Sequence, residues 1–182
     1  MGGGEAVELI KPIVIVEGPD GAGTTTLATE LAITLQVPYH HCGPPETPDP
    51  LTEYWQLAKQ LAVTGGVIDQ FYLGELVYGP LRRQVTYEDR FPWWLLELCL
   101  YKLGALQVIL TGDVATLRGR KQERSAEDLL VEKQAYETEW HRSRMWNVVF
   151  LVEHFQDQPL ALVEAVLKQA IERGKSCSAR EF

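Results

Sequence analysis

The residues from Gly18 to Thr26 combine three glycines with a run of hydroxyl side chains, a composition that can hold a phosphate group. They fit the phosphate-binding pattern G-x-x-x-x-G-K-[ST] with Gly18, Gly23 and Thr25 in place. Glycines let the backbone wrap a phosphate without Cβ clashes, and the helix that follows directs free N–H groups at the same point. We expect the Thr25 hydroxyl to ligate Mg²⁺. The predicted phosphate-binding residues are Gly18, Gly21, Ala22, Gly23, Thr24, Thr25 and Thr26.

Thr24 stands where that pattern has a lysine. The lysine ammonium normally follows the charge that shifts over the β- and γ-phosphates during phosphoryl transfer, so its loss removes an electrostatic contribution to the rate. Another cation would have to substitute. Without the lysine, a glycine-rich turn with a purely structural role is the alternative interpretation of these residues.

Basic residues are concentrated between positions 118 and 144, although the net charge of the chain is −8. This segment is a candidate for holding a small anion. The alternative is a surface helix stabilised by pairs of opposite charge, such as those that Glu123, Glu127 and Asp128 would form. The segment holds seven of the seventeen Lys and Arg residues, namely Arg118, Arg120, Lys121, Arg124, Lys133, Arg142 and Arg144.

A second group of polar residues begins at Asp69, directly after the apolar pair Val67-Ile68. An acid at the carboxyl end of a parallel strand lies where ligands collect in an open α/β sheet, and it can hold Mg²⁺ through water. The alternative for Asp69 is a helix or turn cap. Farther along, Arg82 and Arg83 are adjacent, which indicates either an anion clamp or a solvated pair.

The elements that must position these residues alternate between apolar strands and amphipathic helices. Strands are predicted at residues 10–16, 67–69, 105–111 and 147–152. Helices are predicted at residues 24–35, 51–63, 74–83, 90–103, about 114–142 and 159–173. Strands that are continuously apolar and separated by helices predict a doubly wound parallel sheet flanked by helices on both faces.

Length and composition indicate one globular domain. The chain has 182 residues with 46% hydrophobic and 23% charged residues, which is typical of a single folded domain. The negative charge disfavours a nucleic-acid polymer or a membrane surface as partner. Three scattered cysteines without CxxC spacing indicate neither a disulfide framework nor a zinc site, so we expect a cytoplasmic protein. Residues 1–8 and 175–182 are predicted to be flexible.

Several aromatic residues lie near the candidate site residues in the sequence. We expect the pair Trp93-Trp94 to divide between the core and the wall of a cleft. His40 and His41 beside Cys42 do not indicate a metal site, because no second ligand cluster accompanies them. The candidates for stacking on a base are Tyr39, Tyr54, Trp55 and Tyr72.

Two of these motifs resemble those of thymidylate kinases. The loop EGPDGAGTTT at residues 17–26 is similar to EGxDGAGKTT of that family, and its threonine variant is also similar to GxGTTT of archaeal cytidylate kinases, which are active enzymes. Residues 69–83 resemble DRxxxSExVYGxxxR of phage-type relatives, which indicates a viral source and hence a host cytoplasm. Gln70 and Gly74 depart from that motif, because the family has arginine and serine there.

The resemblance implies a P-loop nucleoside monophosphate kinase with a helical lid over about residues 118–128. Such an enzyme transfers the γ-phosphoryl group of ATP to a deoxynucleoside monophosphate with Mg²⁺, and dimers are common in the family. Thr25 and Asp69 are the implied magnesium ligands. Asp69, Arg120 and Arg124 are the implied catalytic residues, and Arg118, Arg120 and Arg124 the implied lid residues. Asp20, Gln70, Tyr78, Arg82 and Arg83 are the implied acceptor-binding residues.

Two other functions remain open at this point. The changes at Gln70 and Gly74 fit a P-loop kinase for a different acceptor, such as a nucleoside or a purine or modified deoxynucleotide. The second open function is a nucleotide-binding protein without catalysis. It is suggested by Thr24 and Gln70, which stand where the resembling families have a lysine and an arginine. The three loop glycines, Asp20, Thr25, Asp69 and the basic segment are nevertheless all present, which favours an enzyme.

Overall fold

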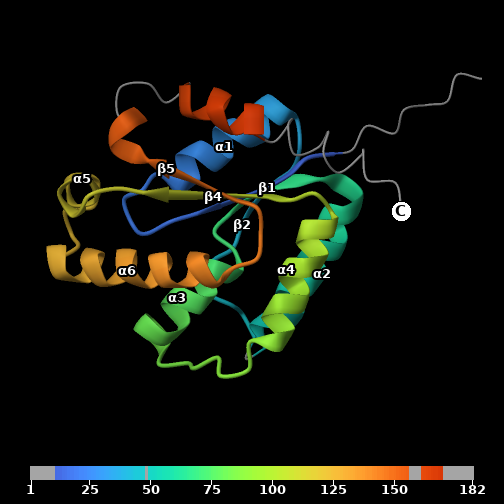
Figure 1. The fold of residues 1–182 in the computed structure, drawn as a ribbon, viewed down its shortest axis with the longest axis horizontal. Coiled ribbons are helices and arrows are strands. Elements are labelled where there is room, and N and C mark those ends of the chain that lie inside the picture. The colour runs from blue at the N-terminus through green and yellow to red at the C-terminus, as the bar shows by residue number, and fades with distance from the viewer. Residues whose placement is uncertain (1–10, 48, 156–160, 170–182) are drawn as a thin grey trace, which may run out of the picture.

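A computed structural model describes residues 11–47, 49–155 and 161–169 of the chain. It contains a five-stranded sheet in which every strand pair is parallel, with the order β2-β3-β1-β4-β5 (Figure 1). The predicted doubly wound fold is confirmed. The strands are β1 (Ile13–Glu17), β2 (Tyr39–His41), β3 (Gly66–Asp69), β4 (Leu106–Thr111) and β5 (Asn147–Leu151).

Strand β2 was not predicted. It consists of Tyr39, His40 and His41, lies at the edge of the sheet and is largely exposed. An edge strand buries little apolar surface, so its sequence carries no apolar run. The other strands match the predicted apolar segments, and the inner strands β1, β3 and β4 are buried over their full length.

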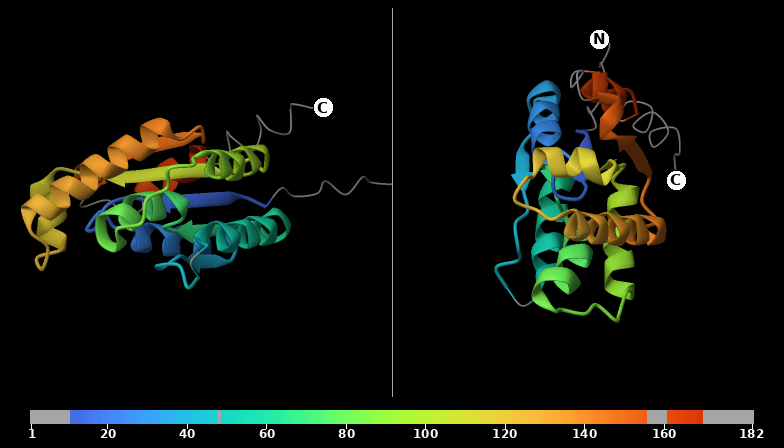
Figure 2. Two further views of the ribbon diagram at one scale, coloured as in Figure 1. Left: turned by 90° about the horizontal axis from the view of Figure 1, so that it is seen from below. Right: turned by 90° about the vertical axis from the view of Figure 1, so that its left-hand side faces the viewer.

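Helices cover both faces of the sheet, as Figure 1 and Figure 2 show. On one face, α1 (Thr24–Leu35) and a helix at residues 161–169 pack through Leu27, Leu31, Val163 and Val166. The other face is built around Ile15, Ile68 and Ile109. The helices there are α2 (Pro50–Thr64), α3 (Tyr72–Arg83), α4 (Phe91–Lys102) and α6 (Ala126–Arg142).

The charged segment predicted as one helical stretch is divided in two. Helix α5 (Val114–Arg120) ends just before Lys121, and α6 begins after Ser125, whose hydroxyl accepts a hydrogen bond from the Asp128 N–H as a helix cap. Helix α5 lies beyond the carboxyl end of β4 (Figure 1). The break therefore brings Arg120, Lys121 and Arg124 to the edge where the strands end.

Near the carboxyl terminus, β5 is followed by a short 3-10 helix, η1 (Val152–Phe155). The predicted helix at residues 159–173 is described only for 161–169. The predicted flexible ends at 1–8 and 175–182 lie outside the described residues. Within the described part of the chain, no helix has the length and apolar character that crossing a membrane requires.

Candidate functional site

The phosphate loop connects β1, the central strand, to the N-terminus of α1. Gly21 and Gly23 have φ values of +84° and +89°, a backbone conformation that side chains with a Cβ rarely adopt. A Cβ on Gly21 would also lie 2.5 Å from the carbonyl oxygen of Leu117, and a Cβ on Gly18 would clash with that of Leu110. The glycines therefore allow the loop to curl tightly against β4 and α5.

Asp69 and Thr25 meet at the carboxyl edge of the sheet. Asp69 is fully buried, and its Oδ2 accepts a hydrogen bond from Thr25 Oγ1 at 2.6 Å. The same oxygen lies 3.0 Å from the Tyr39 hydroxyl and 3.0 Å from His41 Nδ1. Its other oxygen, Oδ1, is buried without a hydrogen-bond partner among the described residues.

This oxygen-rich pair fits Mg²⁺. The Thr25 hydroxyl donates its proton to Asp69 and keeps lone pairs free, and Asp69 Oδ1 is an unsatisfied acceptor. Mg²⁺ prefers oxygen ligands and usually keeps several waters and substrate phosphates in its shell. Accordingly, the described residues need not form a full protein cage, and they contain no group of three or more His, Cys, Asp or Glu side chains that could hold a metal.

The phosphate loop lines a pocket of about 620 Å³. Its lining includes the loop residues 19–26, and its far wall is apolar, with Leu110, Val152, Leu162 and Val163. We call it the donor pocket. Gly18, predicted as a phosphate-binding residue, is not part of this lining, because it packs against β4.

Arg120 extends over the phosphate loop from the end of α5. Its Nη1 lies 3.5 Å from the carbonyl oxygen of Ala22, and both Arg120 and Lys121 line the donor pocket. Thr24 is buried in the first turn of α1. Arg120 thus brings a guanidinium beside the loop whose lysine position is occupied by Thr24. Lys121, also in this lining, was not among the predicted ATP-binding residues.

The other two predicted lid arginines lie elsewhere. Arg118 is exposed and does not line the donor pocket. Arg124 forms an ion pair with Glu132 on α6, and its Nε lies 3.6 Å from Asp20 Oδ2. The structure therefore places Arg120 at the phosphate loop and Arg124 beside Asp20.

A smaller pocket of about 160 Å³ lies on the other side of Asp20. We call it the acceptor pocket. Asp20 and Gln70 line both pockets, so the two hollows adjoin. Gln70 has φ +57°, unusual for a residue other than glycine, and its N–H donates to Val16 O at 2.9 Å. Of the predicted acceptor residues, the pocket brings together Asp20, Gln70, Tyr78, Arg82 and Arg83.

A charge cluster joins the phosphate loop to α3 and α6. Arg82 Nη2 lies 2.8 Å from Asp20 Oδ2 and 2.7 Å from Glu132 Oε1, and its guanidinium stacks 4.1 Å from the centre of the Tyr78 ring. Although partial burial opposes it, hydrogen bonding to Glu132 and Asp20 raises the pKa of Arg82 above its usual value. Burial raises the pKa of Tyr78 well above its usual value, so its hydroxyl stays protonated.

Glu132 was missed by sequence reasoning, although a signal was present. Leu129, Glu132, Tyr136 and Glu139 are all buried and recur at helical spacing along α6. An acid in such a stripe is a buried charge, which requires a partner. Here the partners are the arginines Arg82 and Arg124, in the cluster just described.

Two further carboxylates, those of Glu75 and Glu17, stabilise helix α3, which lines the acceptor pocket. Glu75 pairs with Arg83 and accepts a hydrogen bond from the Tyr87 hydroxyl. Glu17 is buried beneath the start of α3 and accepts hydrogen bonds from the backbone N–H groups of residues 71, 73 and 74. Burial raises the pKa of Glu17 to about 8. Glu17 thus replaces a conventional helix cap, because the N-cap residue Phe71 provides none.

The four aromatic residues proposed for base stacking lie in different surroundings, and not all of them are at the acceptor pocket. Tyr54 lines the acceptor pocket. Tyr72 is fully buried, with its hydroxyl 3.1 Å from Gln107 Oε1, so it is a core residue and the prediction is wrong for it. Tyr39 binds Asp69 with its hydroxyl, and Trp55 packs at the margin of the core.

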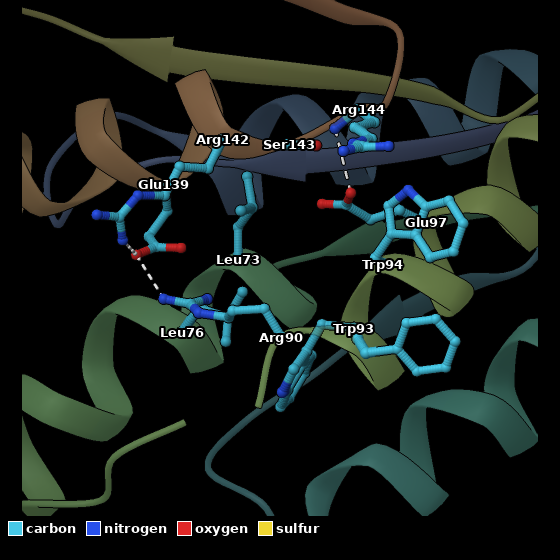
Figure 3. A pocket seen from close by; sticks show the side chains of 11 residues that line it. Leu73, Leu76, Arg90, Trp93, Trp94, Glu97, Glu139, Arg142, Ser143 and Arg144 are labelled. Carbon is cyan, nitrogen blue, oxygen red and sulfur yellow. Dashed lines mark hydrogen bonds and ion pairs between the residues drawn. The ribbon is translucent and has the colours of Figure 1, made fainter. Parts of the chain in front are cut away.

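A separate pocket of about 470 Å³ lies between α3, α4 and the end of α6 (Figure 3). Trp93 is buried and Trp94 is partly exposed, and both line this pocket, as predicted for the pair. Its carboxylate Glu139 is already paired with arginines. It lies 2.8 Å from Arg90 and also pairs with Arg142, as the dashed lines in Figure 3 mark. This pocket contains no phosphate loop and stands apart from Asp69.

Comparisons with known proteins support the fold. No family model and no curated protein matches the chain. Bacillus subtilis YorR in complex with phosphorylated GDP superposes with a TM-score of 0.75 at 17% identity, over 86% of this chain and 94% of that one.

Deoxyadenosine kinase from M. mycoides, with the products dCMP and dCDP bound, gives a TM-score of 0.56 at 16% identity over 86% of this chain and 97% of that one. A sugar kinase from Janibacter gives 0.53 at 16% identity over 92% and 98%. The chain therefore shares its five-stranded parallel sheet and flanking helices with these solved structures, two of which are kinases.

Proposed function

We propose that this chain is an ATP-dependent phosphotransferase that moves the γ-phosphoryl group of ATP to a nucleoside-type acceptor. The observation that carries this proposal is the pair of adjoining pockets that share Asp20 and Gln70 at the carboxyl edge of the sheet. Phosphoryl transfer requires mainly that donor and acceptor be held in line and that charge be stabilised. Adjoining pockets with a phosphate loop in one of them meet the first requirement.

On the donor side, the backbone of residues 19–25 would bind the ATP phosphates at the N-terminus of α1. Arg120 would supply the cation that Thr24 does not, because its guanidinium already lies over the loop. Thr25 and Asp69 would hold Mg²⁺, which neutralises charge on phosphate oxygens when it is bound. Residues of about 118–128, where α5 ends and α6 begins, would act as a lid that excludes water.

On the acceptor side, the resemblance to thymidylate kinases makes a deoxynucleoside monophosphate the first candidate, with a deoxynucleoside diphosphate as product. Asp20, Gln70, Tyr78, Arg82 and Arg83, which line the acceptor pocket, would bind the acceptor. The deoxyadenosine kinase and YorR structures, which hold nucleotides, support a nucleoside-type acceptor. A nucleoside is the second candidate, favoured by the uncharged Gln70.

The test is to incubate the protein with Mg-ATP and a panel of ribo- and deoxynucleosides and their 5′-monophosphates, and to measure ADP release and the phosphorylated product for each. We expect turnover with one or a few acceptors, and a kcat at least about 100-fold lower in Asp69→Asn. If ATP binds but no acceptor yields ADP above background, the chain is a nucleotide-binding protein without catalysis. A homodimer and a cytoplasmic location stay predictions.

A further inference from the structure

The arginines that line the acceptor pocket are paired with carboxylates among the residues that the structure describes. Arg83 forms an ion pair with Glu75. Arg82 lies 2.8 Å from Asp20 and 2.7 Å from Glu132, so a single guanidinium bridges two acids. No arginine of this pocket is therefore left with its charge uncompensated in the described part of the chain.

These pairs are difficult to open, because their acids are buried. The side chains of Glu132 and Glu75 are only 3% and 2% exposed. Arg124 also pairs with Glu132, which makes a cluster of two acids, Asp20 and Glu132, and two arginines with no net charge. Removing an arginine from a buried carboxylate leaves an uncompensated charge, which is strongly unfavourable.

A monophosphate would fit this pocket poorly. A phosphate monoester carries a charge of about −1.5 to −2 at neutral pH. In the pocket it would meet Asp20 without a free guanidinium to balance it. Position 70 provides only the amide of Gln70, where the resembling kinases have an arginine. The dianion would have to compete with Asp20 and Glu132 for Arg82.

An uncharged acceptor uses the same groups without that competition. Paired carboxylates such as Asp20 keep lone pairs that accept hydrogen bonds from sugar hydroxyls, and the Gln70 amide can both donate and accept. Tyr54 and Tyr78 add aromatic surface to the pocket, which suits a base. The pocket thus combines neutral polar recognition with aromatic contact.

We infer that the acceptor of this proposed phosphotransferase is an uncharged nucleoside and not a nucleoside monophosphate. The inference rests on the proposed function. A nucleoside hydroxyl oxygen forms a bond with the γ-phosphorus, and the bond from that phosphorus to the β,γ-bridging oxygen breaks. ADP leaves with the electron pair, and the hydroxyl proton is released to water. The products are ADP and a nucleoside monophosphate.

The experiment compares kcat/KM for matched pairs, each a nucleoside and its own 5′-monophosphate, with saturating Mg-ATP and mass-spectrometric identification of products. We expect the nucleoside of the best pair to be preferred at least tenfold. Binding of each member to the protein, with a non-hydrolysable ATP analogue present, is measured in parallel by calorimetry. We expect the same preference in binding.

Two variants test the charge argument. Gln70→Arg adds one cation to the pocket, and Asp20→Asn releases Arg82 from one acid. Each should shift the nucleoside-to-monophosphate ratio of kcat/KM at least tenfold towards the monophosphate. Asp20 is partly exposed, so Asp20→Asn keeps the test usable if Gln70→Arg does not fold. Asp89→Asn, the same chemical change at an exposed residue just before α4, should leave the ratio unchanged.

The outcomes separate the inference from the proposed function. Preference for the monophosphate overturns the inference and leaves the phosphotransferase intact. Failure of both variants to shift the ratio also overturns it, as does a protein that binds ATP but neither member of any pair. A protein that releases no ADP with any acceptor, whether or not it binds ATP, overturns the proposed function, and the inference with it.

Discussion

The donor pocket and the acceptor pocket adjoin, yet they use their cations differently. Arg120 lies over the phosphate loop and has no ion-pair partner among the residues described. Arg82 and Arg83, at the acceptor pocket, are each held by buried acids. Positive charge is thus available where ATP phosphates would bind and neutralised where the acceptor would bind. The comparison shows that counting basic residues near a site does not reveal which ligand they can serve.

The turn between α5 and α6 separates two arginines, Arg120 and Arg124, in the same way. Arg120 ends α5, and Arg124 follows only four positions later, just before the Ser125 cap of α6. The chain changes direction between them, so one guanidinium reaches Ala22 and the other reaches Glu132. Residues that a single lid helix would place together therefore contact different parts of the site.

The largest effect should come from the change at Asp69, the proposed magnesium ligand. Asp69→Asn removes the charge beside Thr25 while keeping an oxygen that can accept the Thr25 and Tyr39 hydrogen bonds. We expect kcat to fall at least about 100-fold, comparable to loss of a preorganised electrostatic group. Steady-state ADP release measures it, with circular dichroism to verify folding. A kcat within tenfold of wild type would remove Asp69 from the mechanism.

Next in size is the loss of the donor-side cation. Arg120→Ala should lower kcat more than tenfold, which is about 1.4 kcal/mol of barrier, and leave the acceptor KM nearly unchanged. Thr24→Lys in the Arg120→Ala background should restore part of the activity, because it returns a cation to the same loop. Arg142→Ala, an exposed arginine at the separate pocket of Figure 3, is the control. An equal loss in Arg142→Ala would contradict the assignment.

Removing an arginine on the acceptor side should have a smaller effect, limited to kcat/KM for the acceptor. Arg124→Ala removes one of the two arginines that neutralise Glu132. We expect kcat/KM for the acceptor to fall up to about tenfold and the KM for ATP to stay within about twofold. Varying each substrate at saturation of the other separates the two. A rise in the KM for ATP alone would move Arg124 to the donor side.

The smallest effect concerns stability beneath the acceptor side. Burial raises the pKa of Glu17 to about 8, from 4.5 in an unfolded chain, so the folded state binds a proton that the unfolded state releases between these values. Unfolding free energy should therefore fall as pH rises through this window, by at most about 1.4 kcal/mol per pH unit. Urea unfolding at pH 6 and pH 7 measures this slope. Glu17→Gln should flatten it, and equal slopes would contradict the pKa shift.

The elements with strong local signals were predictable. Helix α1 spans the predicted residues, Thr24 to Leu35, because a glycine loop precedes it and its apolar residues recur at helical spacing. The placement of Asp69 at a carboxyl edge followed from the apolar strand before it. Strand β2 has no such signal, since its three residues are polar and its pairing is decided by its neighbour β3.

The pairing of charges was not predictable from local pattern. Glu132 is 112 residues from Asp20 and 50 from Arg82, so only tertiary structure brings these side chains together. The same limit applied to Tyr72, which lies among candidate site residues in sequence but points into the core. Which residues reach a site from one helix depends on the face that the core buries, and several neighbouring elements set that face.

Gln70, with its left-handed backbone at the junction of the two pockets, also has a consequence for protein engineering. A left-handed conformation costs a residue with a Cβ roughly 1–2 kcal/mol relative to glycine. Directed evolution for heat resistance would thus favour Gly or Asn at this position, and either would shorten or delete the amide between the pockets. Selection for thermostability alone is therefore expected to erode substrate recognition first at position 70.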